Sequence, residues 1–532
     1  MSSATSASAG TAEADRHDVP VRRPLNRPSL EAALGVEAAV SSPVRVFQGY
    51  DSIIGAGLGT AIQGTAESVG ARSDVSYTGC ESIETLSRAL QIDQSLSVSF
   101  GPFGSIDEKM SFVYNLDVTT TSVSIVVYAK HVTGKQALTD YGLKPNIPPP
   151  SSDEELKRFF HGYGDSFLSS VTSGGEYYAV YTFYTQTKTE QASLVAELKG
   201  KGIWSTTKVD ASLQVKLNEF VSSTTTRTEF KQSVSGLLNP KLPDPDHIVT
   251  YALAFPSVPI DAPAIIGFET LGYEHVPAIQ DFQPIVKNRI YFVGSGTDAG
   301  LTKDLVKLQQ LQNQAKWIKS VYQFYGGYTD EKLDNVSKLA AADIKVIDDQ
   351  IVAFEANPIQ TFTRPPLKAL DYGTPALDYG VGKSPSWGGD GGGPFDDVDI
   401  RTAIQQLTWL SAVQLRTGAV VDRLIAVYES ENGQRWVANH GGDGGSLGAE
   451  LKLLPGQFVV KASGRSGSLV DRLDLVISDG RRCAGGGGGG GPFDWSVPDG
   501  SFVLGFAGRS GAKLDQIAVV YAGFKPARWT PF

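Results

Sequence analysis

Apolar and polar residues alternate in many short runs over the first half of the chain. From about residue 44 to residue 290 the sequence is rich in Ser, Thr, Val and Tyr, and two runs illustrate the alternation: Ser122–Tyr128 and Tyr177–Tyr184. Successive side chains of a β-strand point to opposite faces, so a period of two indicates strands. The pattern predicts a region built mainly from β-structure.

Helical spacing of apolar residues replaces the alternation in two places. The segment from Ser152 to Phe160 begins like a capped helix, with Ser152 as N-cap and Glu155 three positions later. Residues 302–355 contain two apolar stripes at spacings of three and four, which predict further helices. The stripes consist of Leu305, Leu308, Leu311 and Ala315, and of Ile344, Ile347, Ile351 and Phe354.

These patterns divide the 532 residues into four parts. Residues 1–43 are Ser- and Ala-rich and then Arg- and Pro-rich, so we expect a disordered arm. Residues 44–356 are expected to form an α+β domain with trailing helices. Residues 357–386 are punctuated by Pro and Gly, which predicts a linker. Residues 387–532 are expected to form a second, all-β domain.

Composition narrows the class of protein. Charged residues are 20% and hydrophobic residues 41%, which is ordinary for a soluble chain. The formal net charge of −10 leaves no basic surface for nucleic acid, so we expect no nucleic-acid partner. Two cysteines, Cys80 and Cys483, cannot build a disulfide framework. The six histidines show no metal-ligand spacing, so we expect neither a metal nor a cofactor.

The sequence also shows no membrane helix and no secretion signal. No uninterrupted apolar run approaches the roughly 20 residues of a membrane helix, and the N-terminal stretch lacks the apolar core of a signal peptide. We expect a protein that is made in soluble form and released from its producer by a route that the sequence does not define.

Three stretches near the C-terminus share one pattern, Arg-Ser/Thr-Gly-x-x-hydrophobic-Asp-polar-Leu/Ile. They begin at Arg416, Arg465 and Arg509, and each runs into an apolar segment. Glycine-rich runs accompany them at 388–393, 441–445 and 485–491. A threefold repeat of a glycine loop and alternating strands predicts three antiparallel sheets around a pseudo-threefold axis, with one shared core.

This region resembles the jacalin-related lectins. The resemblance is carried by Gly508–Asp515, by Gly388–Gly392 and by Pro394–Asp396. It implies an all-β, β-prism I domain with pseudo-threefold symmetry that binds cell-surface glycans through a Gly-x-x-x-Asp motif. The sugar-binding residues that it implies are Gly418, Asp422, Gly467, Asp471, Gly511 and Asp515, together with Gly388, Gly389, Gly441 and Gly442 of the glycine loops.

The residue types suit sugar binding. An ionised Asp accepts hydrogen bonds from two adjacent sugar hydroxyls, and glycine lets the backbone approach the sugar closely. The residues between Gly and Asp include no aromatic side chain, so the type of sugar is left open. The alternative is that the repeat is only the scaffold of the fold and that the Asp residues cap turns.

A second motif lies in the first domain. Tyr163–Phe167 reads Tyr-Gly-Asp-Ser-Phe, and a Gly-Gly pair follows after six residues. This resembles the signature of the membrane-attack-complex/perforin (MACPF) family, Tyr-Gly-Thr/Ser-His-Phe/Tyr-x6-Gly-Gly. Asp165 and Ser166 depart from the signature. The matching residues are Tyr163, Gly164, Phe167, Gly174 and Gly175.

The MACPF resemblance implies a bent, twisted antiparallel sheet flanked by helical clusters, which refold into two transmembrane β-hairpins per subunit. With a lectin domain attached, the chain resembles insecticidal bacterial MACPF toxins. The resemblance therefore implies a soluble monomer that binds glycans at the plasma membrane of a target cell. There it would assemble with copies of itself into a homo-oligomeric pore in the lipid bilayer.

In two segments that flank the signature, apolar and polar residues alternate over a length suited to such hairpins. A membrane strand needs about 9–11 residues with lipid-facing and lumen-facing sides. The run 208–217 fits best, and 191–199 also has helical spacing. The alternative is that these runs are ordinary strands facing a core. The candidate membrane-inserting residues are Leu96, Val98, Phe100, Met110, Phe112, Tyr114, Leu194, Leu198, Val209, Ala211, Leu213, Val215 and Leu217.

Two other classes of function compete with a pore. The sequence contains no Gly-x-Ser-x-Gly elbow, and its longest glycine run lacks the Lys-Ser/Thr of a phosphate loop, so we expect no catalytic residues and no enzyme. A non-lytic glycan-binding or adhesion protein with an inactive MACPF domain is the alternative function.

Overall fold

The computed structural model describes residues 45–70, 72–92, 109, 112–113, 116–205, 208–295, 298–431 and 433–532. Val44–Phe532 form one compact unit. Its first region, up to Tyr372, combines helices and strands, as expected for an α+β fold. Its second region, from Thr374 onward, consists of strands and one short helix. The predicted disordered arm, residues 1–43, lies outside the described residues.

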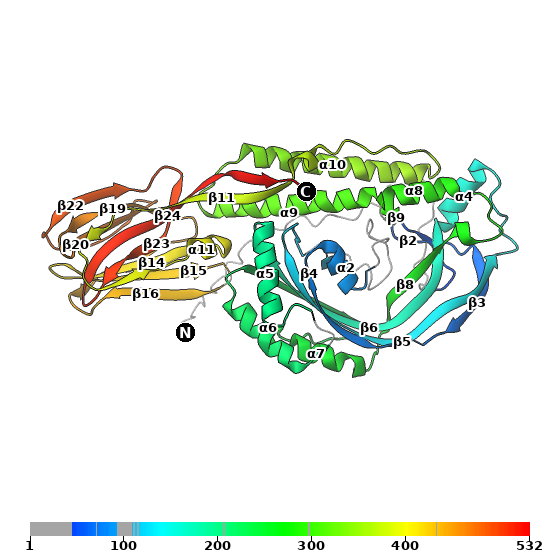
Figure 1. Cartoon of the computed structure of the whole chain (residues 1–532), viewed down its shortest axis with the longest axis horizontal. Helices are drawn as coiled ribbons and strands as arrows, with labels where there is room; N and C mark the ends of the chain where they lie inside the picture. The colour runs from blue at the N-terminus through cyan, green and yellow to red at the C-terminus, as the bar shows by residue number, and fades with distance from the viewer. Residues whose placement is uncertain are drawn as a thin grey trace, which may run out of the picture. The chain divides into compact units, whose positions relative to one another are not determined.

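An eight-stranded antiparallel sheet forms the framework of the first region (Figure 1). Its two longest strands, β5 and β6, pair with each other in the middle of the sheet. Strands β3 and β4 flank successive halves of β5, and β8 and β7 flank successive halves of β6. The strands are β1 (Gly49–Asp51), β2 (Ala56–Gly57), β3 (Ile62–Ser68), β4 (Asp74–Cys80), β5 (Val123–Leu143), β6 (Ser166–Tyr184), β7 (Arg227–Ser235) and β8 (Ala264–Gly272). A separate two-stranded ribbon joins β9 (Gly294–Ser295) and β10 (Asp298–Ala299).

The helices form where the apolar spacing predicts them. The N-cap of α4 is Ser152, whose side chain accepts a hydrogen bond from the Glu155 backbone N–H. The predicted reciprocal bond is displaced by one residue, because the Glu155 carboxylate accepts from Ser151 instead. The helices are α2 (Ile83–Ala89), α4 (Asp153–Tyr163), α5 (Lys188–Gly200), α6 (Ala211–Ser223), α7 (Ile248–Ala254), α8 (Gln283–Val293), α9 (Leu301–Phe324) and α10 (Glu331–Ala356). The short 3-10 helices are η2 (Pro245–His247), η3 (Phe255–Ser257), η4 (Tyr273–His275) and η5 (Lys368–Tyr372).

One half of the central sheet is covered on both faces. The first face, which includes Val127 and Tyr181, packs against α5, α6 and α7. The opposite face, which includes Tyr128 and Val180, packs against α2 and residues that follow it (Figure 1). The predicted strand at Tyr177–Tyr184 is confirmed, but its two faces do not differ in exposure: every residue of the run is buried, because both faces of the sheet are covered here.

The second region contains three antiparallel sheets, as the threefold repeat predicts. Their inner faces share one hydrophobic core, which includes Val413, Leu473 and Ile517. The strands and helix are β11 (Thr374–Lys383), β12 (Trp387–Gly388), β13 (Gly393–Asp396), α11 (Ile400–Gln405), β14 (Thr408–Thr417), β15 (Val421–Ser430), β16 (Arg435–Gly441), β17 (Ser446–Leu447), β18 (Leu451–Lys452), β19 (Val459–Ser466), β20 (Val470–Ile477), β21 (Arg482–Gly486), β22 (Gly491–Ser496), β23 (Ser501–Ser510) and β24 (Leu514–Thr530).

The prediction of an irregular linker over residues 357–386 is wrong for its second half. Thr374–Lys383 is strand β11, which pairs along its length with β24. Its Pro375 occupies an edge strand, where a missing backbone N–H is tolerated. Three of the Pro and Gly residues that suggested a linker, Pro375, Gly380 and Gly382, therefore belong to an edge strand of the first of the three sheets.

The core of the second region continues into helix α9. Tyr325, which follows α9, is buried, and its ring stacks on Phe502 with centroids 4.4 Å apart. Its hydroxyl donates to the carbonyl oxygens of Ala403 and Thr408, at 3.0 and 2.7 Å. Trp317 and Ile318 of α9 belong to the same hydrophobic cluster. The three sheets are therefore joined to the helical region by packed apolar side chains as well as by the chain itself.

We predict that this joint makes the unfolding of the two regions cooperative. Tyr325→Ala should lower the free energy of unfolding by about 3–5 kcal/mol, as for other buried aromatic truncations. Tyr325→Phe should lower it by about 1–3 kcal/mol, since two buried carbonyls lose their donor. Differential scanning calorimetry measures both, and two separate transitions in the unmodified protein would contradict the prediction.

Candidate functional site

Each Gly-x-x-x-Asp segment forms the same tight turn between two strands of one sheet. The glycine N–H donates to the carbonyl oxygen two residues later in all three copies. These bonds run from Gly418 to Val420, from Gly467 to Leu469 and from Gly511 to Lys513, at 3.0, 2.9 and 3.0 Å. The repeated sequence therefore builds three copies of one local structure.

Each Asp lies against one glycine loop. The backbone N–H of Gly389, Gly442 and Gly487 donates to the carbonyl oxygens of Asp515, Asp422 and Asp471, at 2.9, 3.0 and 2.8 Å. A methyl group added to Gly391, Gly444 or Gly489 would lie only 2.3–2.4 Å from a carboxylate oxygen of the same Asp residues. The loop 388–392 thus faces Asp515, the loop 441–445 faces Asp422, and the loop 486–490 faces Asp471.

Two positions of each loop require glycine for a second reason. The first has φ of 124°, 121° and 111° at Gly388, Gly441 and Gly486. The fifth position, at residues 392, 445 and 490, has φ of 62°, 61° and 65°. Other residues rarely adopt such left-handed conformations, so the backbone amides of the loop are held beside the carboxylate without intervening side chains.

The arginine that opens each repeat holds the loop in place. The guanidinium of Arg416 donates to the carbonyl oxygens of residues 443–445, at 3.1–3.3 Å. Arg465 donates to those of residues 489 and 490, at 2.9 and 2.6 Å. Arg509 donates to those of residues 390–392, at 2.7–3.0 Å. Each arginine opens the repeated pattern, but its role depends on contacts with a loop 24 or more residues away and is not visible in the pattern alone.

The oxygens of the three carboxylates are not engaged by other described protein groups. Asp422 is buried, and Asp471 and Asp515 are partly buried. Across the ranges that the structure describes, no hydrogen bond or ion pair to another side chain or backbone group occupies their oxygens. A partly desolvated carboxylate beside backbone amides is suited to a ligand that offers adjacent hydroxyl groups, since each hydroxyl both donates and accepts.

The three candidate sites form a closed ring. A methyl group added at Gly389, Gly442 or Gly487 would lie 2.3–2.6 Å from the carbonyl oxygen of a residue in the turn of a neighbouring sheet. Those neighbours are Ser468, Ala512 and Ala419, respectively. Each loop therefore faces its own Asp on one side and touches the turn of the next site on the other.

The ring of sites lies at the end of the three sheets that is remote from α9. Strand β14 begins at Thr408, whose carbonyl oxygen accepts the hydrogen bond from the Tyr325 hydroxyl. The strand ends at Thr417, next to Gly418. Strand β23 likewise begins beside Phe502 and ends next to Gly511. Ten extended residues span about 30 Å. The sites are therefore separated from the helical joint by the length of a strand.

Three sheets around a shared core, with a glycine loop and an open carboxylate at one end of each sheet, define a β-prism of the carbohydrate-binding type. A family model described as "Jacalin-like lectin domain" matches residues 384–520. These residues form a jacalin-like lectin domain, and such a domain implies carbohydrate binding. The prediction of a jacalin-related, β-prism domain is confirmed.

Solved structures of plant lectins resemble the same part of the chain. Malaysian banana lectin is 24% identical and covers 28% of this chain and 99% of its own, with a TM-score of 0.24. AcmJRL, a mannose-binding jacalin-related lectin from Ananas comosus, is 25% identical and covers 27% and 99%, with a TM-score of 0.24. Frutapin from Artocarpus incisa is 24% identical and covers 26% and 95%, with a TM-score of 0.23. A search of curated protein sequences finds no match.

The structure brings the predicted sugar-site residues together in a defined pairing. Gly388 and Gly389 lie with Gly511 and Asp515, whereas Gly441 and Gly442 lie with Gly418 and Asp422. Gly467 and Asp471 take their loop from residues 486–490. The second glycine pair of each loop faces the carboxylate. In the loops 388–392 and 441–445 this pair was missed, although the Gly-Gly-x-Gly-Gly spacing contained the signal; the missed residues are Gly391, Gly392, Gly444 and Gly445. For the third loop the resemblance implies one pair within 485–491, and Gly489 and Gly490 face Asp471.

The signature-like segment of the first region lies where α4 passes into β6. Tyr163 ends α4, and Gly164 has φ of 80° and leaves no space for a Cβ beside the Tyr50 carbonyl. Phe167 is fully buried. Gly174 and Gly175 lie in the middle of β6, where its partner changes from β8 to β7. A Cβ at either of these two glycines would lie 2.0–2.6 Å from a neighbouring atom.

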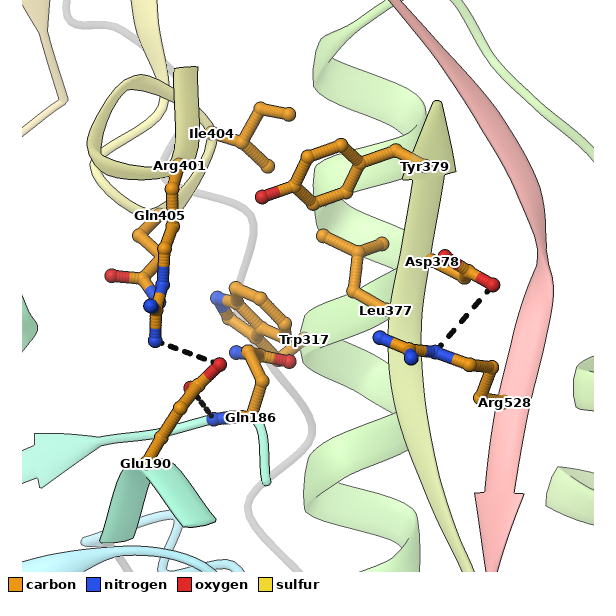
Figure 2. A pocket seen from close by; sticks show the side chains of 10 residues that line it. All are labelled: Gln186, Glu190, Trp317, Leu377, Asp378, Tyr379, Arg401, Ile404, Gln405 and Arg528. Atoms are coloured by element: carbon orange, nitrogen blue, oxygen red, sulfur yellow. Dashed lines mark hydrogen bonds and ion pairs between the residues drawn. The ribbon is translucent and has the colours of Figure 1, made fainter. Parts of the chain in front are cut away.

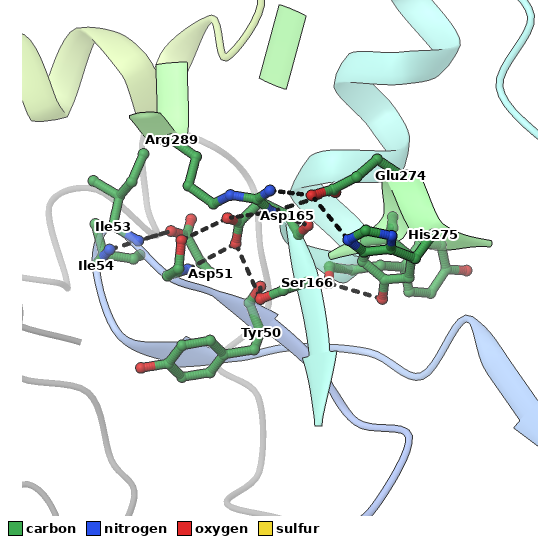
Figure 3. Close-up of polar contacts among 12 residues, drawn as sticks. Tyr50, Asp51, Ile53, Ile54, Asp165, Ser166, Glu274, His275 and Arg289 are labelled. Carbon is green, nitrogen blue, oxygen red and sulfur yellow. Dashed lines mark hydrogen bonds and ion pairs between the residues drawn. The ribbon is translucent and has the colours of Figure 1, made fainter. Parts of the chain in front are cut away.

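The two positions that depart from the signature belong to a buried polar cluster (Figure 3). The Asp165 carboxylate accepts from the Ser52 backbone N–H at 2.8 Å and from its hydroxyl at 2.5 Å, and Ser166 donates to the Tyr50 carbonyl. Asp51 accepts from the backbone N–H groups of Ile53 and Ile54. Arg289 of α8 lies 3.6 Å from the Asp165 carboxylate and also pairs with Glu274, which lies 3.8 Å from His275.

Burial raises the pKa of both carboxyl groups in this cluster. The pKa of Asp51 is raised from 3.8 to about 7, first by burial and second by the nearby Asp165 carboxylate. The pKa of Asp165 is also raised by burial, and Arg289 and Ser52 oppose the shift. Asp51 further shares a side-chain hydrogen bond with Glu355. The cluster thus joins β1, β6, α8 and the end of α10 around two buried carboxyl groups whose pKa values are raised.

The candidate membrane-inserting residues lie partly inside and partly outside the described residues. Leu96, Val98, Phe100, Met110 and Tyr114 lie outside them. Phe112 packs against Tyr178 with ring centroids 4.8 Å apart. Leu194 and Leu198 lie buried in α5, whose predicted helical stripe is confirmed. Ala211, Leu213, Val215 and Leu217 lie in α6 rather than in a strand, and Val209 precedes it. Within the described ranges, no helix is long and apolar enough to cross a membrane.

A small cavity separates helix α5 from the lectin domain (Figure 2). Its volume is about 170 Å³. Arg401 of α11 reaches Glu190 of α5 across it at 2.7 Å, and Arg528 lies 3.5 Å from Asp378. Trp317 of α9 lines the cavity. The contact between α5 and the lectin domain is therefore polar and incompletely packed, unlike the joint at α9.

We predict that Asp51 makes stability depend on pH. A carboxyl group whose pKa is raised on folding stabilises the fold below its unfolded pKa, and this contribution is lost as pH rises through the folded pKa. The contribution of Asp51 to stability should therefore be lost between about pH 4 and pH 7 and change no further above that range. Asp51→Asn should remove this decrease.

Thermal unfolding of the unmodified protein and of Asp51→Asn at pH 5 and pH 8 measures the effect. Asp371→Asn, at an exposed position, serves as the control. The same loss of stability in Asp51→Asn as in the unmodified protein would show that another group titrates.

Proposed function

We propose that the protein is a glycan-directed pore-forming protein. Its lectin domain binds glycans at the plasma membrane of a target cell. The first region then assembles with copies of itself and inserts two β-hairpins per subunit into the bilayer. The observation that carries the proposal is that the described parts of the two flanking segments cover opposite faces of β5 and β6. These parts are Phe112, Val113, Leu116 and Val118 on one face and helices α5 and α6 on the other. Insecticidal activity is part of the proposal through the resemblance to bacterial MACPF toxins.

Three adjacent sites favour binding to a surface that carries many glycans. A single shallow sugar site binds weakly, but linked sites raise the apparent affinity through effective concentration. All three sites lie on one end of the lectin domain, so they can engage one glycan-covered surface together. Binding by this end would keep the first region near the membrane without involving it directly.

We predict that Asp422→Ala, Asp471→Ala and Asp515→Ala each remove one sugar site. A charged acceptor of two hydroxyl groups is lost at each site, so the triple variant should retain less than about one-tenth of the glycan binding. Binding to a glycan array measures the effect. Asp499→Ala, at an exposed loop position, is the control. Full binding by the triple variant would remove the sugar-site assignment.

The second flanking segment supports insertion through its side-chain pattern. Leu213 and Leu217 are buried in α6, whereas Val215 is 58% exposed. An α-helix therefore divides the alternating apolar residues of 209–217 between core and solvent. An extended strand would place all of them on one face, as a lipid-facing strand requires. The helix leaves part of this apolar surface in water. This exposure lowers the free-energy difference between the helix of the soluble protein and the extended, lipid-facing strand.

The first flanking segment is fastened to the sheet by a buried ion pair. Lys109 Nζ lies 2.6 Å from the Glu176 carboxylate, and both side chains are almost completely buried. The ammonium group also donates to the carbonyl oxygens of Leu90 and Ile266 at 3.3 Å. Ile266 lies at a register shift between β8 and β6. Release of this segment must separate this ion pair, so the pair specifies where Lys109 sits on the sheet in the soluble state.

Oligomerisation follows from the chemistry of the bilayer. An isolated hairpin would leave unpaired backbone N–H and C=O groups in hydrocarbon, at a cost of several kcal/mol each. A closed ring of hairpins pairs these groups between neighbouring subunits. The proposal therefore requires a homo-oligomer on the membrane and allows a monomer in solution.

The lectin domain holds the second segment only weakly. The Glu190 and Arg401 side chains are 22% and 56% exposed, and such pairs contribute about 0.2–1 kcal/mol. Gln406 adds one hydrogen bond to the Thr225 carbonyl beyond α6, at 3.4 Å. Helices α5 and α6 can thus leave the sheet without separating the lectin domain from α9.

We predict that a covalent bridge between α5 and α11 blocks the pore. Glu190→Cys with Arg401→Cys, joined by a reducible bis-methanethiosulfonate linker, should bind glycan-bearing vesicles but release no enclosed dye. Reduction of the linker should restore release. The native Cys80 and Cys483 are buried, so they should react slowly with the reagent.

The matched control joins two elements that are not proposed to move. Lys319 and Asp334 form an ion pair of 2.7 Å between α9 and α10. The same linker between Lys319→Cys and Asp334→Cys should leave dye release intact. Release by the bridged Glu190→Cys/Arg401→Cys protein would falsify insertion of this segment. Glycan binding with no dye release by the unmodified protein would favour a non-lytic lectin instead.

A further inference from the structure

The three sugar sites differ at one pair of charged positions. The residue after each site Asp pairs across the sheet with the first glycine of the facing loop, in the registers Arg423–Gly441, Arg472–Gly486 and Gln516–Gly388. The residue in the middle of the loop is Asp443, Gly488 and Asp390, respectively. The three sites therefore carry Arg with Asp, Arg with Gly, and Gln with Asp.

At the Asp422 site the two charges neutralise each other. Arg423 Nη1 lies 2.9 Å from the Asp443 carboxylate, and Arg423 Nε donates to the Gly441 carbonyl at 3.3 Å. This ion pair lies beside the site and is formed entirely by the protein. A ligand at this site therefore meets no uncompensated cation from the pair.

At the Asp471 site the corresponding arginine has no acidic partner. Gly488 replaces the loop aspartate, and no described residue lies within 4 Å of the position that a Cβ would take there. Arg472 is exposed, and no described residue forms an ion pair or side-chain hydrogen bond with its guanidinium. The Asp471 site thus combines an unpaired cation with the open space that a carboxylate occupies in its neighbour.

We propose that the Asp471 site binds acidic glycans, with a ligand carboxylate or sulfate beside Arg472 in the position that Asp443 takes beside Arg423. The proposal rests on the sugar-binding function of the Gly-x-x-x-Asp turns and specifies the ligand class of one of them. Guanidinium groups bind carboxylates and sulfates in charge-assisted, often bidentate hydrogen bonds.

The neighbouring site shows that such an arrangement is compatible with the site Asp. Asp422 belongs to the turn and Asp443 to the loop that faces it, and the two carboxylates form no direct bond. The charge of Asp443 is compensated by Arg423. A ligand anion beside Arg472 would have the same relation to Asp471. Arg465 contributes a second positive charge nearby, through its contacts with the carbonyls of residues 489 and 490.

The test isolates one site at a time on a glycan array. Asp422→Ala with Asp515→Ala leaves the Asp471 site, and Asp471→Ala with Asp515→Ala leaves the Asp422 site. The array carries matched pairs of glycans, each neutral member beside one that bears a carboxylate, as sialic or uronic acid, or a sulfate ester. The quantity measured is the ratio of affinity for the acidic member to affinity for the neutral member.

The Asp471 site should prefer acidic members by about fivefold to tenfold, and the preference should decline at high salt. In this background, Gly488→Asp rebuilds the ion pair of the neighbouring site and should abolish the preference, as should Arg472→Met. Conversely, Asp443→Gly in the background that leaves the Asp422 site should create a preference for acidic glycans. Carboxylated and sulfated members distinguish which anion fits.

The outcomes separate this proposal from the more general one. Equal ratios for the two single-site proteins, or a ratio unchanged by Gly488→Asp, would overturn the acidic subsite while leaving sugar binding intact. A lack of binding to every glycan in both backgrounds would overturn the sugar-binding function and this subsite together.

Discussion

The burial of both faces of the β5–β6 pair is the constraint on which the first region depends. Tyr177, Ala179 and Tyr181 point to one face, and Tyr178 and Val180 to the other, so neither face tolerates water. Helices α5 to α7 cover one face, and α2 with Phe112, Val113, Leu116 and Val118 covers the other. The two segments proposed to enter a membrane are thus the same segments that keep this sheet out of water, and the soluble fold requires both.

The lectin domain obeys a different constraint, the need for glycine around an open carboxylate. Left-handed backbone at two positions of each loop, and the absence of space for a Cβ at others, keep side chains away from Asp422, Asp471 and Asp515. Arg416, Arg465 and Arg509 fasten the loops through carbonyl oxygens and leave the carboxylates unoccupied. The three sites share the same backbone and the same arginine contacts. They differ in charge at the centre of the loop, which is Asp443, Gly488 or Asp390.

The two regions meet through joints of unequal strength. Tyr325 and its neighbours in α9 share an apolar core with the three sheets, whereas α5 reaches α11 through an exposed ion pair beside a cavity. In the proposed mechanism this difference matters, because the lectin domain must remain attached to the helices that stay behind and must release the helices that refold. A strong apolar joint and a weak polar contact satisfy the two requirements separately.

The sequence by itself determined the repeated elements, because they depend on local spacing. Three copies of Arg-Ser/Thr-Gly-x-x-x-Asp with glycine runs specified three sheets and their turns, and the stripes of α9 and α10 specified helices of nearly the right length. Only the tertiary structure decided which loop faces which Asp, since that pairing joins residues up to 127 positions apart, as Gly388 and Asp515 are. It also decided that Pro375 lies in an edge strand and that the alternating run 209–217 is helical, because the packing of α6 on the sheet overrides the local preference for a strand.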